Sequence, residues 1–132
     1  MIELILPWPP SVNHYKNIGA TRTTKKGKSY QARINSPDTK LFYYEVWLKI
    51  RSLSAAKRME MAPHSTIVLQ VCIDLHPPDK RRRDVDNNIK IILDSLVRGG
   101  LIEDDSQIHR LVVEKKGIIP QGQTIVRIEE LT

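Results

Sequence analysis

The sequence has a single cysteine and no long hydrophobic run. Cys72 alone can form neither an internal disulfide framework nor a zinc site built on cysteine pairs. No apolar run approaches the ~18 residues that a membrane span requires, so no transmembrane helix is expected. No cationic segment precedes the first apolar residues after Met1. We therefore expect neither secretion nor membrane anchoring, and we expect a reducing cytoplasmic location.

The composition is that of an ordinary globular protein. Of the 132 residues, 40% are hydrophobic and 27% are charged, which excludes collagen-like and intrinsically disordered classes. The length favours one domain spanning residues 1–132. The 21 Lys and Arg residues outnumber the 15 Asp and Glu residues, giving a net charge of +6, which favours a polyanionic partner without identifying one.

Hydrophobic periodicity and turn residues predict the order β-α-β-α-β-β. Ser36, Pro37 and Asp38 combine an N-cap, a proline at the first helical position and an acid in the first turn. The second helix is amphipathic and ends at Gly99-Gly100. This order predicts an α+β fold, in which a small mixed sheet packs with two helices. Strands are expected at 2–6, 66–75, 108–116 and 123–131, and helices at 37–59 and 85–98.

The segment from residue 11 to residue 35 has neither a helical nor a strand period, so we expect a long loop there. Loops of this length are usually functional or mobile. No acid occurs from Ser11 to Ser36, whereas basic residues are frequent. We refer to residues 14–35 as the basic segment. Its basic residues are Lys16, Arg22, Lys25, Lys26, Lys28 and Arg33.

Two aspartates stand at the start of the second expected helix, directly after three arginines. Residues two apart point the same way on an extended backbone and about 200° apart on a helix. Asp84 and Asp86 can therefore serve one site only if this junction is not yet helical. Alternatively, Asp86 is an N-cap. Capping needs one carboxylate rather than two, so the pair favours a ligand-binding site.

A second acidic group, Glu103-Asp104-Asp105, follows the glycine turn. Acids in this position are commonly solvated loop residues, and that alternative remains open. If the chain returns to the sheet beside the first pair, one of these acids faces Asp84 and Asp86, and a cation would offset their repulsion. Oxygen ligands without cysteine or paired histidines select Mg²⁺ or Mn²⁺ over zinc. Such an ion supports phosphodiester hydrolysis.

Basic residues accompany these acids. Lys90 follows Asp86 by one helical turn and can offset charge on a phosphate or orient the attacking water. The alternative is a surface ion pair with Asp86 or Asp94. Arginine side chains can bind phosphates bidentately, and the basic segment can follow a nucleic-acid backbone. The candidate DNA-binding residues are Arg81, Arg82, Arg83, Lys16, Arg22, Lys25, Lys26, Lys28 and Arg33.

These motifs resemble the RusA family of Holliday junction resolvases over most of the chain. The resemblance is carried by residues 6–15 (LPWPPSVNHY), by residues 83–87 (RDVDN) with Lys90, and by residues 104–108 (DDSQI). It implies a RusA-like fold and a homodimeric, Mg²⁺-dependent endodeoxyribonuclease, with Mn²⁺ as an alternative ion. Such an enzyme resolves four-way DNA junctions by paired symmetric nicks during recombination and repair. It is often encoded by phages or prophages.

The resemblance also implies roles for individual residues. The catalytic and metal-binding acids would be Asp84, Asp86 and Asp105, and Lys90 would be the catalytic lysine. Asp104 would have a lesser or structural role.

A homodimer also suits the symmetry of the expected substrate. A two-fold junction presents two equivalent scissile phosphates, and a C₂ dimer presents two equivalent sites. Ile91 lies off the main apolar face of the second helix and is a candidate interface residue, the alternative being a lone surface isoleucine. Trp8, Tyr15 and Tyr30 are expected to pack locally rather than to stack on bases.

Two other functions remain open on the sequence alone. One is a non-catalytic nucleic-acid-binding module, in which the acids only cap and solvate. The other is a nuclease with the same metal chemistry that acts on another branched substrate or on RNA. A binding module would leave DNA intact in the presence of Mg²⁺, which distinguishes it from a nuclease. A comparison of four-way, three-way and linear duplexes distinguishes a junction resolvase from a nuclease with another substrate.

Overall fold

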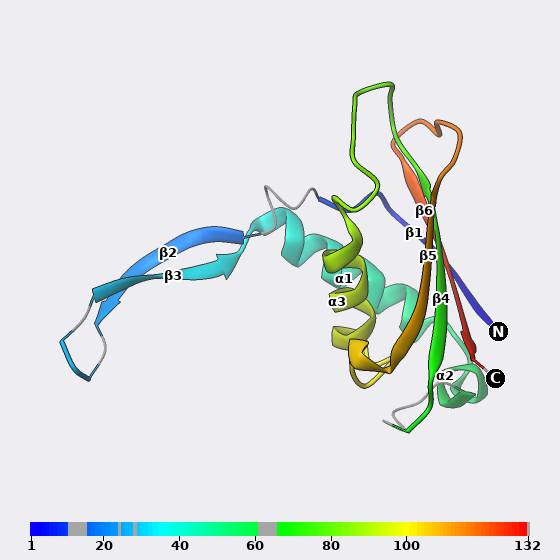
Figure 1. The fold of residues 1–132 in the computed structure, drawn as a ribbon, viewed down its shortest axis with the longest axis horizontal. Coiled ribbons are helices and arrows are strands. Elements are labelled where there is room, and N and C mark those ends of the chain that lie inside the picture. The colour runs from blue at the N-terminus through cyan, green and yellow to red at the C-terminus, as the bar shows by residue number, and fades with distance from the viewer. Residues whose placement is uncertain (11–15, 24, 28, 61–65, 132) are drawn as a thin grey trace.

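The computed structural model has a small body and a projecting two-stranded arm (Figure 1). For residues 16–23, 29–34 and 60 only the backbone is described. The residues described are 1–10, 16–23, 25–27, 29–60 and 66–131.

The body contains a four-stranded mixed sheet with the strand order β1-β6-β4-β5. Its strands are β1 (Ile2–Leu6), β4 (Leu69–His76), β5 (Ile108–Lys115) and β6 (Gln123–Glu130). Strands β1 and β4 both pair antiparallel with β6, whereas β4 and β5 are parallel. A parallel pair needs a crossover connection, and the chain between β4 and β5 supplies it with one helix. The predicted α+β class with a mixed sheet is confirmed.

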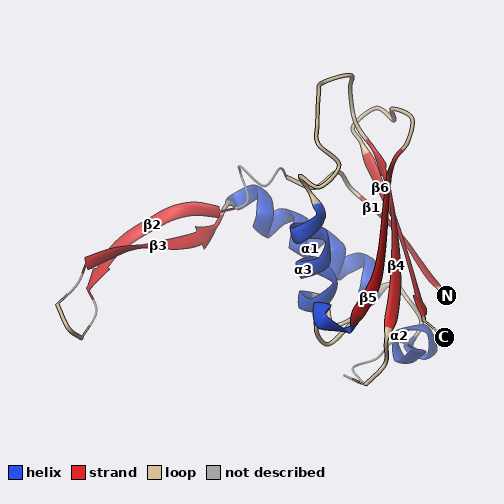
Figure 2. Cartoon of the chain, viewed as in Figure 1, coloured by secondary structure: helices blue, strands red, loops and turns tan. Residues whose placement is uncertain are grey.

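Two helices, α1 (Pro37–Arg51) and α3 (Ile89–Arg98), cover one face of this sheet (Figure 2). Alternate residues of β1 and β4 are buried beneath them, because side chains of a strand alternate between its two faces. A short helix, α2 (Ala55–Glu60), lies near the two termini (Figure 1). None of the helices among the described residues has the length and apolarity needed to cross a membrane.

The helix expected at 37–59 is two helices. Its start is as predicted, because the Ser36 hydroxyl accepts a hydrogen bond from the Thr39 amide at 3.2 Å. The chain leaves the first helix at Ser52, and the Ser54 hydroxyl then caps α2 by accepting from the Lys57 amide at 3.2 Å. Serine side chains compete for backbone groups in this way, and the apolar spacing did not reveal the break.

The loop expected at 11–35 contains a β-hairpin, so that prediction was wrong for the described part of the segment. Strands β2 (Lys16–Thr23) and β3 (Ser29–Asn35) pair antiparallel, with a register shift between Ile18 and Thr21. The hairpin projects away from the sheet and helices (Figure 1). Backbone pairing does not require alternating apolar residues, so the sequence lacked the usual strand signal.

Ile91 is 2% exposed and belongs to the hydrophobic core, so the prediction that it lies at a dimer interface was wrong. It is buried together with Ile92 and Leu96 of the same helix. The less buried apolar side chains of α3 are Ile89, Leu93 and Val97, which follow one another at every fourth position.

Candidate active site

The loop between β4 and α3 carries the first pair of predicted acids. It lies at the end of the body where β4 finishes, and α3 begins only at Ile89 (Figure 1). Asp84 and Asp86 thus precede the helix, which begins four residues later than the expected start at residue 85 and so meets the condition under which both acids can serve one site. Their backbone carbonyls accept hydrogen bonds from the Asn87 amide at 3.2 Å and from the Ile89 amide at 3.4 Å. These bonds form a tight turn that fixes the path of the chain between the two acids.

Both carboxylates are available to a ligand. Asp84 and Asp86 are exposed, and neither side chain forms a hydrogen bond or an ion pair with any residue that the structure describes. Asn88 occupies the N-cap position of α3, although its side chain makes no capping hydrogen bond, so the alternative in which Asp86 serves as the N-cap is wrong. Two exposed carboxylates directly beside arginines are accessible to a cation or to a phosphate-bound ion, which favours a role in binding.

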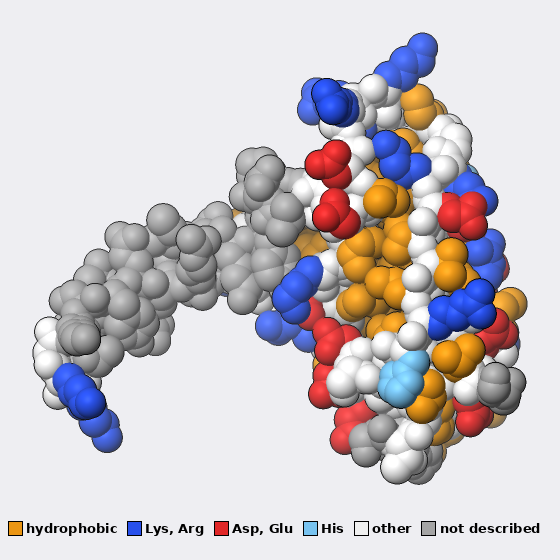
Figure 3. Space-filling model, in the orientation of Figure 1, with side chains coloured by type: hydrophobic (Ala, Val, Ile, Leu, Met, Phe, Trp, Pro, Cys, Tyr) orange, Lys and Arg blue, Asp and Glu red, His pale blue; other side chains and the backbone are white. Residues whose placement is uncertain are grey.

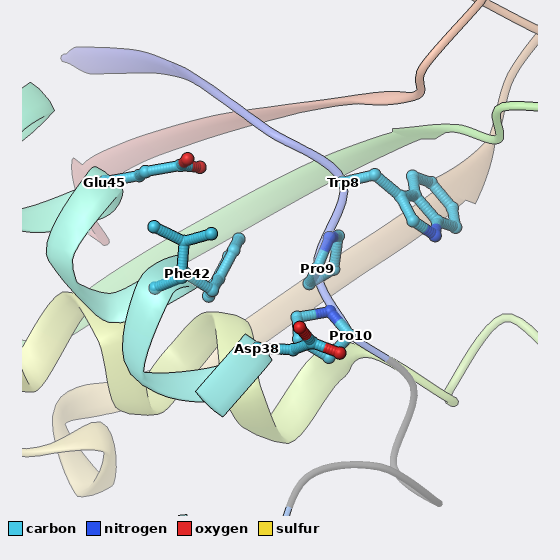
Figure 4. Close-up of a pocket in the computed structure, with 7 residues that line it drawn as sticks. Trp8, Pro9, Pro10, Asp38, Phe42 and Glu45 are labelled. Carbon is cyan, nitrogen blue, oxygen red and sulfur yellow. The ribbon is translucent and has the colours of Figure 1, made fainter. Parts of the chain in front are cut away.

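The Asn88 side chain connects this loop to the proline-rich segment that follows β1. Its side chain is 2% exposed and its amide nitrogen donates to the carbonyl of Pro10 at 3.0 Å and to that of Pro9 at 3.4 Å. The proline-rich segment after β1 therefore supports the acidic loop. The same segment borders a surface hollow of about 280 Å³ against α1. Figure 4 shows Trp8, Pro9 and Pro10 opposite Asp38, Phe42 and Glu45 of α1.

Trp8 and Asp79 hold Arg83 beside the acids. The guanidinium carbon of Arg83 lies 5.7 Å from the centre of the Trp8 ring, and its Nη1 lies 2.7 Å from Asp79 Oδ1. Trp8 also packs against Gly122, where an added Cβ would meet the Trp8 Cβ at 2.6 Å. The local packing predicted for Trp8 is confirmed, and it fixes an arginine.

Asp79 was not identified from the sequence. It also accepts a hydrogen bond from the Arg81 amide at 3.0 Å, and the bond from Arg83 is the main cause that lowers the pKa of its carboxyl. The only available signal was an acid placed four residues before an arginine. Arg82 is exposed and, with Arg83, Asp84 and Asn87, lines a surface hollow of about 360 Å³. Figure 3 shows Lys and Arg side chains gathered at this end of the molecule.

The second acidic group is built into the fold. Asp104 is the N-cap of a 3₁₀ turn, η2 (Asp105–Gln107), and its carboxylate accepts from the Ser106 amide at 3.3 Å. The Gln107 side chain is 3% exposed, and its oxygen accepts from the backbone amides of Glu103 at 2.9 Å and Asp104 at 3.1 Å. Glu103 and Asp104 are nevertheless exposed, so the alternative of solvated acids remains open for them, although their backbone forms a capped turn with a buried anchor.

Asp104 and Asp105 each shift the pKa of the other through a hydrogen bond between their side chains. A hydrogen bond with Asp104 is the main cause that raises the pKa of Asp105, whereas the Ser106 amide lowers that of Asp104. Lys90 lowers the pKa of Asp105 and Asp94 raises it, so these groups share one environment. Lys90 itself forms an ion pair with Asp94 at 3.2 Å, which is one of the alternatives considered for it.

The two acidic groups do not meet within one chain. Among the described residues no group of three or more His, Cys, Asp or Glu side chains could hold a metal ion, and the predicted convergence of Asp84, Asp86 and Asp105 is not found. The reason is topological. In a β-α-β unit the two loops lie at opposite ends of the helix, and α3, with ten residues, is about 15 Å long. The acids before and after α3 are separated by that length.

The basic segment is described only in part. Lys25 and Lys26 are exposed in the turn between β2 and β3. Lys16, Arg22 and Arg33 lie on strands whose side chains are not described, and Lys28, Tyr15 and the side chain of Tyr30 are also outside the described part of the chain. The hairpin thus places at least two basic side chains far from the sheet.

Comparison with known proteins gives consistent matches over nearly the whole chain. The protein-family profile described as Endodeoxyribonuclease RusA matches residues 6–129. The protein named crossover junction endodeoxyribonuclease rusA of Enterobacteria phage HK97 is 32% identical over 129 residues, covering 98% of this chain and 94% of that protein. The protein of the same name from Escherichia coli strain K12 is 31% identical over 134 residues, with the same two coverages. That of Enterobacteria phage 82 is also 31% identical.

Proposed function

Because this chain belongs to the RusA endodeoxyribonuclease family, we propose that it resolves four-way DNA junctions by hydrolysing one phosphodiester bond in each of two strands. The observation that supports this most directly is the loop before α3. There two exposed, unpaired carboxylates stand beside a hollow lined by Arg82 and Arg83. Carboxylates that would repel DNA are combined with side chains that bind phosphate, as a metal-dependent nuclease requires.

The cofactor in this proposal is Mg²⁺, with Mn²⁺ as the alternative. The donor chemistry of Asp84 and Asp86 fits, because Mg²⁺ is commonly held by one or two carboxylates together with substrate phosphate oxygens and water. A bound ion of this kind polarises the phosphoryl oxygen and lowers the pKa of a bound water. In our proposal Asp84, Asp86 and Asp105 are the carboxylates that hold the ion and act in catalysis, and Asp105 would come from the second copy of a homodimer, since α3 separates it from Asp84 and Asp86 within one chain.

The basic residues then have distinct tasks. Arg82 and Arg83 bind the phosphate beside the acids, and the Trp8 ring and Asp79 limit the motion of the Arg83 guanidinium. Lys90, whose side chain is 69% exposed, exchanges its ion pair with Asp94 for a contact with the negatively charged substrate. Arg81 and the basic segment, including Lys25 and Lys26, bind phosphates farther along the junction arms.

The active form in this proposal is a homodimer in the cytoplasm of a bacterial cell, where the junctions arise. Two symmetric nicks need two equivalent sites, and a two-fold dimer supplies them with a single interface repeated by symmetry. The relatives from phages HK97 and 82 make a phage or prophage source consistent with this location.

Substitution of Asp84 by Asn tests the catalytic assignment. We expect Asp84→Asn to lose nicking of a synthetic mobile junction by more than about 100-fold while binding the junction at least as tightly as the wild type, because a carboxylate that repels phosphate has been neutralised. The matched control is Asp74→Asn, which removes the same charge from the other face of the sheet. Nicking by Asp84→Asn at the wild-type rate would contradict the assignment.

The same assay decides between the substrate classes. Four-way, three-way and linear duplex DNA and a branched RNA are compared with and without Mg²⁺. We expect cleavage of the four-way DNA only, and only with the ion. Intact DNA under all conditions, with affinity that falls steeply with salt, would instead identify a binding module.

A further inference from the structure

One exposed side of α1 carries two aromatic rings between two basic side chains. Lys40, Tyr44, Trp47 and Arg51 are all exposed, and their spacing of four, three and four residues places them on the same side of the helix. We call these four residues the outer stripe. The residues of α1 that are buried in the core are at other positions, namely Thr39, Phe42, Val46 and Ile50. The outer stripe therefore has no part in holding the helix on the sheet.

The two rings are ordered although they are exposed. Tyr44 and Trp47 stack with their ring centroids 6.2 Å apart and their planes at 17°, and the guanidinium carbon of Arg51 lies 5.1 Å from the centre of the Trp47 ring. Tyr44 is nevertheless 57% exposed and Trp47 is 38% exposed. Because their neighbours already restrict the rings, a ligand that covers them loses less binding energy to the ordering of side chains. This arrangement favours a binding surface for a flat, apolar group of a ligand.

The outer stripe is positively charged at both ends. Lys40 and Arg51 are eleven residues apart, which is about 16 Å along a helix. Neither forms an ion pair with a residue that the structure describes, and the stripe contains no acid. Arg98 of α3 is also exposed, and its guanidinium carbon lies 4.6 Å from the centre of the ring of Tyr43, the residue before Tyr44. These cations favour an anionic ligand.

The neighbouring side of α1 carries charge of the other sign. Asp38, Leu41 and Glu45 line the hollow of about 280 Å³ against the proline-rich segment. Figure 4 shows both carboxylates on the side of the helix that borders this hollow. Carboxylates repel phosphate, so we do not expect a nucleic acid to bind there. The outer stripe is therefore the side of α1 that suits a polyanion.

The outer stripe begins close to the base of the projecting hairpin. Strand β3 ends at Asn35 and α1 starts at Pro37, so Lys40 is in the first turn of the helix, beside the point where the hairpin leaves the body (Figure 1). The turn of the hairpin carries the exposed Lys25 and Lys26. Sites for single-stranded nucleic acid combine basic side chains that contact phosphates with aromatic side chains on which bases stack. Bases of a duplex are already stacked on one another, so exposed aromatic rings favour unpaired nucleotides.

From these observations we propose that the outer stripe binds single-stranded DNA, with one base stacked on the Tyr44 ring and with Lys40 and Arg51 holding phosphates on either side. Trp47 and Arg51 keep the Tyr44 ring in place. Because every base presents a flat face, we expect little dependence on sequence. The inference goes beyond the proposed function, since no residue of the stripe lies in the loop before α3 or in the turn after it. It gives an enzyme that acts on branched DNA a second contact, to strands that are not paired.

Binding of a fluorescent oligonucleotide of about 12 thymidines, measured by anisotropy in EDTA, tests this site. We expect Tyr44→Ala to weaken binding by about 10-fold, because a base–aromatic stack is lost, and Tyr44→Phe, which keeps the ring, to bind like the wild type. The matched control is Leu48→Ala, which should also bind like the wild type, since Leu48 is 45% exposed on the same helix but lines a hollow beside Ile5. If the wild type does not bind the oligonucleotide, or if Tyr44→Ala binds it equally tightly, the proposal is overturned, and the exposed rings then indicate a protein partner.

The salt dependence of binding distinguishes a site from general attraction between a basic protein and DNA. We expect Lys40→Gln to lower the slope of log affinity against log salt concentration by about 0.7, the value for one phosphate contact on a single strand. Lys49→Gln removes the same charge from another side of α1, where Lys49 lines the same hollow as Leu48, and should leave the slope unchanged. Equal changes in the two variants would overturn the proposal.

The same variants distinguish unpaired from paired DNA. We expect Tyr44→Ala to bind a duplex of the same length as tightly as the wild type, because the bases of a duplex are not available to the ring. A loss for the duplex equal to that for the oligonucleotide would overturn the proposal. These measurements need neither Mg²⁺ nor a junction. If the wild type cuts no junction, the proposed function fails, whereas these affinities still decide whether the outer stripe binds DNA.

Discussion

The two acidic segments on either side of α3 are built in opposite ways. Before the helix, Asp84 and Asp86 are exposed, and their carboxylates make no hydrogen bond or ion pair with the part of the chain that the structure describes. After the helix, Asp104 caps η2 and the backbone around it is anchored by the buried Gln107. The first segment is held through its own backbone carbonyls, which accept from the Asn87 and Ile89 amides, and through the side chains of Asn88 and Arg83.

The side chains of the segment after the helix make hydrogen bonds that hold the backbone, whereas the carboxylates of Asp84 and Asp86 make none with the described residues. The carboxylates before the helix carry no structural task, so their substitution should change chemistry more than stability. The segment after the helix contributes both a charged group and a capped turn, so substitutions there should affect stability as well. The experiments below test this division, from the largest expected effect to the smallest.

Replacement of Gln107 by Ala should have the largest effect on stability. The change removes the acceptor for two backbone amides and the donor to the Ile67 carbonyl at 3.2 Å. Buried polar groups left without a partner cost about 1–3 kcal/mol each, so we expect a loss of about 3 kcal/mol in the free energy of unfolding, measured by urea titration. The control is Gln70→Ala, whose partner Glu129 is exposed and which should cost less than about 1 kcal/mol.

Replacement of Asn88 by Ala should lower the free energy of unfolding less than Gln107→Ala does, but it should disturb the position of the loop that carries Asp84. It removes the donor to the carbonyls of Pro9 and Pro10, with an expected loss of about 1–2 kcal/mol. Because this bond holds the loop that carries Asp84, nicking should fall by about 10-fold or more even where the protein is fully folded. A fully folded variant that nicks at the wild-type rate would show that the loop does not depend on this anchor.

The sequence predicted most of the body because its signals there are local. Prolines after Leu6, the Ser36 cap and the Gly99-Gly100 turn each mark the end or start of an element, and the structure has these boundaries within a few residues. The hairpin was missed because residues 16–23 and 29–35 lack alternating apolar residues. Their pairing depends on backbone hydrogen bonds, which leave no trace in a hydrophobicity pattern.

The sequence indicated which residues belong to the candidate site but not how they are placed relative to one another. The two-residue spacing allowed Asp84 and Asp86 to serve one site only at a non-helical junction, and the structure has one because α3 starts at Ile89 rather than at the expected residue 85. The convergence with Asp105 was wrong for a single chain because it depends on strand order. Only the parallel pairing of β4 with β5 shows that the two loops lie at opposite ends of the sheet. The anchors Asp79 and Asn88 are long-range or context-dependent contacts, which no local pattern identifies.

Replacement of Asp79 by Asn should affect stability only where the carboxylate is ionised. Its pKa is lowered by the hydrogen bond from Arg83, so the pair stabilises the fold above the ordinary carboxyl pKa, and this contribution is lost as the pH falls through the lowered value. We expect Asp79→Asn to be less stable than the wild type at pH 7, and the difference to shrink as the pH falls below the ordinary carboxyl pKa and through the lowered pKa of Asp79. The isosteric change retains an acceptor for the Arg81 amide, which confines the effect to the charge.

The control for Asp79→Asn is Asp74→Asn, since Asp74 pairs with Arg127 at 2.8 Å on the other face of the sheet. Both changes raise the net charge by the same amount, so both should strengthen non-specific DNA binding equally. Asp79→Asn alone should weaken binding of the junction relative to this control, by about two- to ten-fold, because Arg83 loses the contact that orders it. Equal junction affinity for the two variants would show that Asp79 has no role in binding the junction.

Replacement of Asp104 by Asn should have the smallest effect and should appear only in the pH dependence. The amide oxygen can still accept from the Ser106 amide, so the cap on η2 survives. The hydrogen bond and the charge of Asp104 both raise the pKa of Asp105, and their removal lowers it. If nicking requires Asp105 in its ionised form, the acidic limb of the pH–rate profile moves to lower pH in this variant, and the rate at neutral pH changes little. An unmoved acidic limb would mean that ionisation of Asp105 does not limit the reaction in acid. The carboxylates required for nicking would then be Asp84 and Asp86, at the opposite end of the helix.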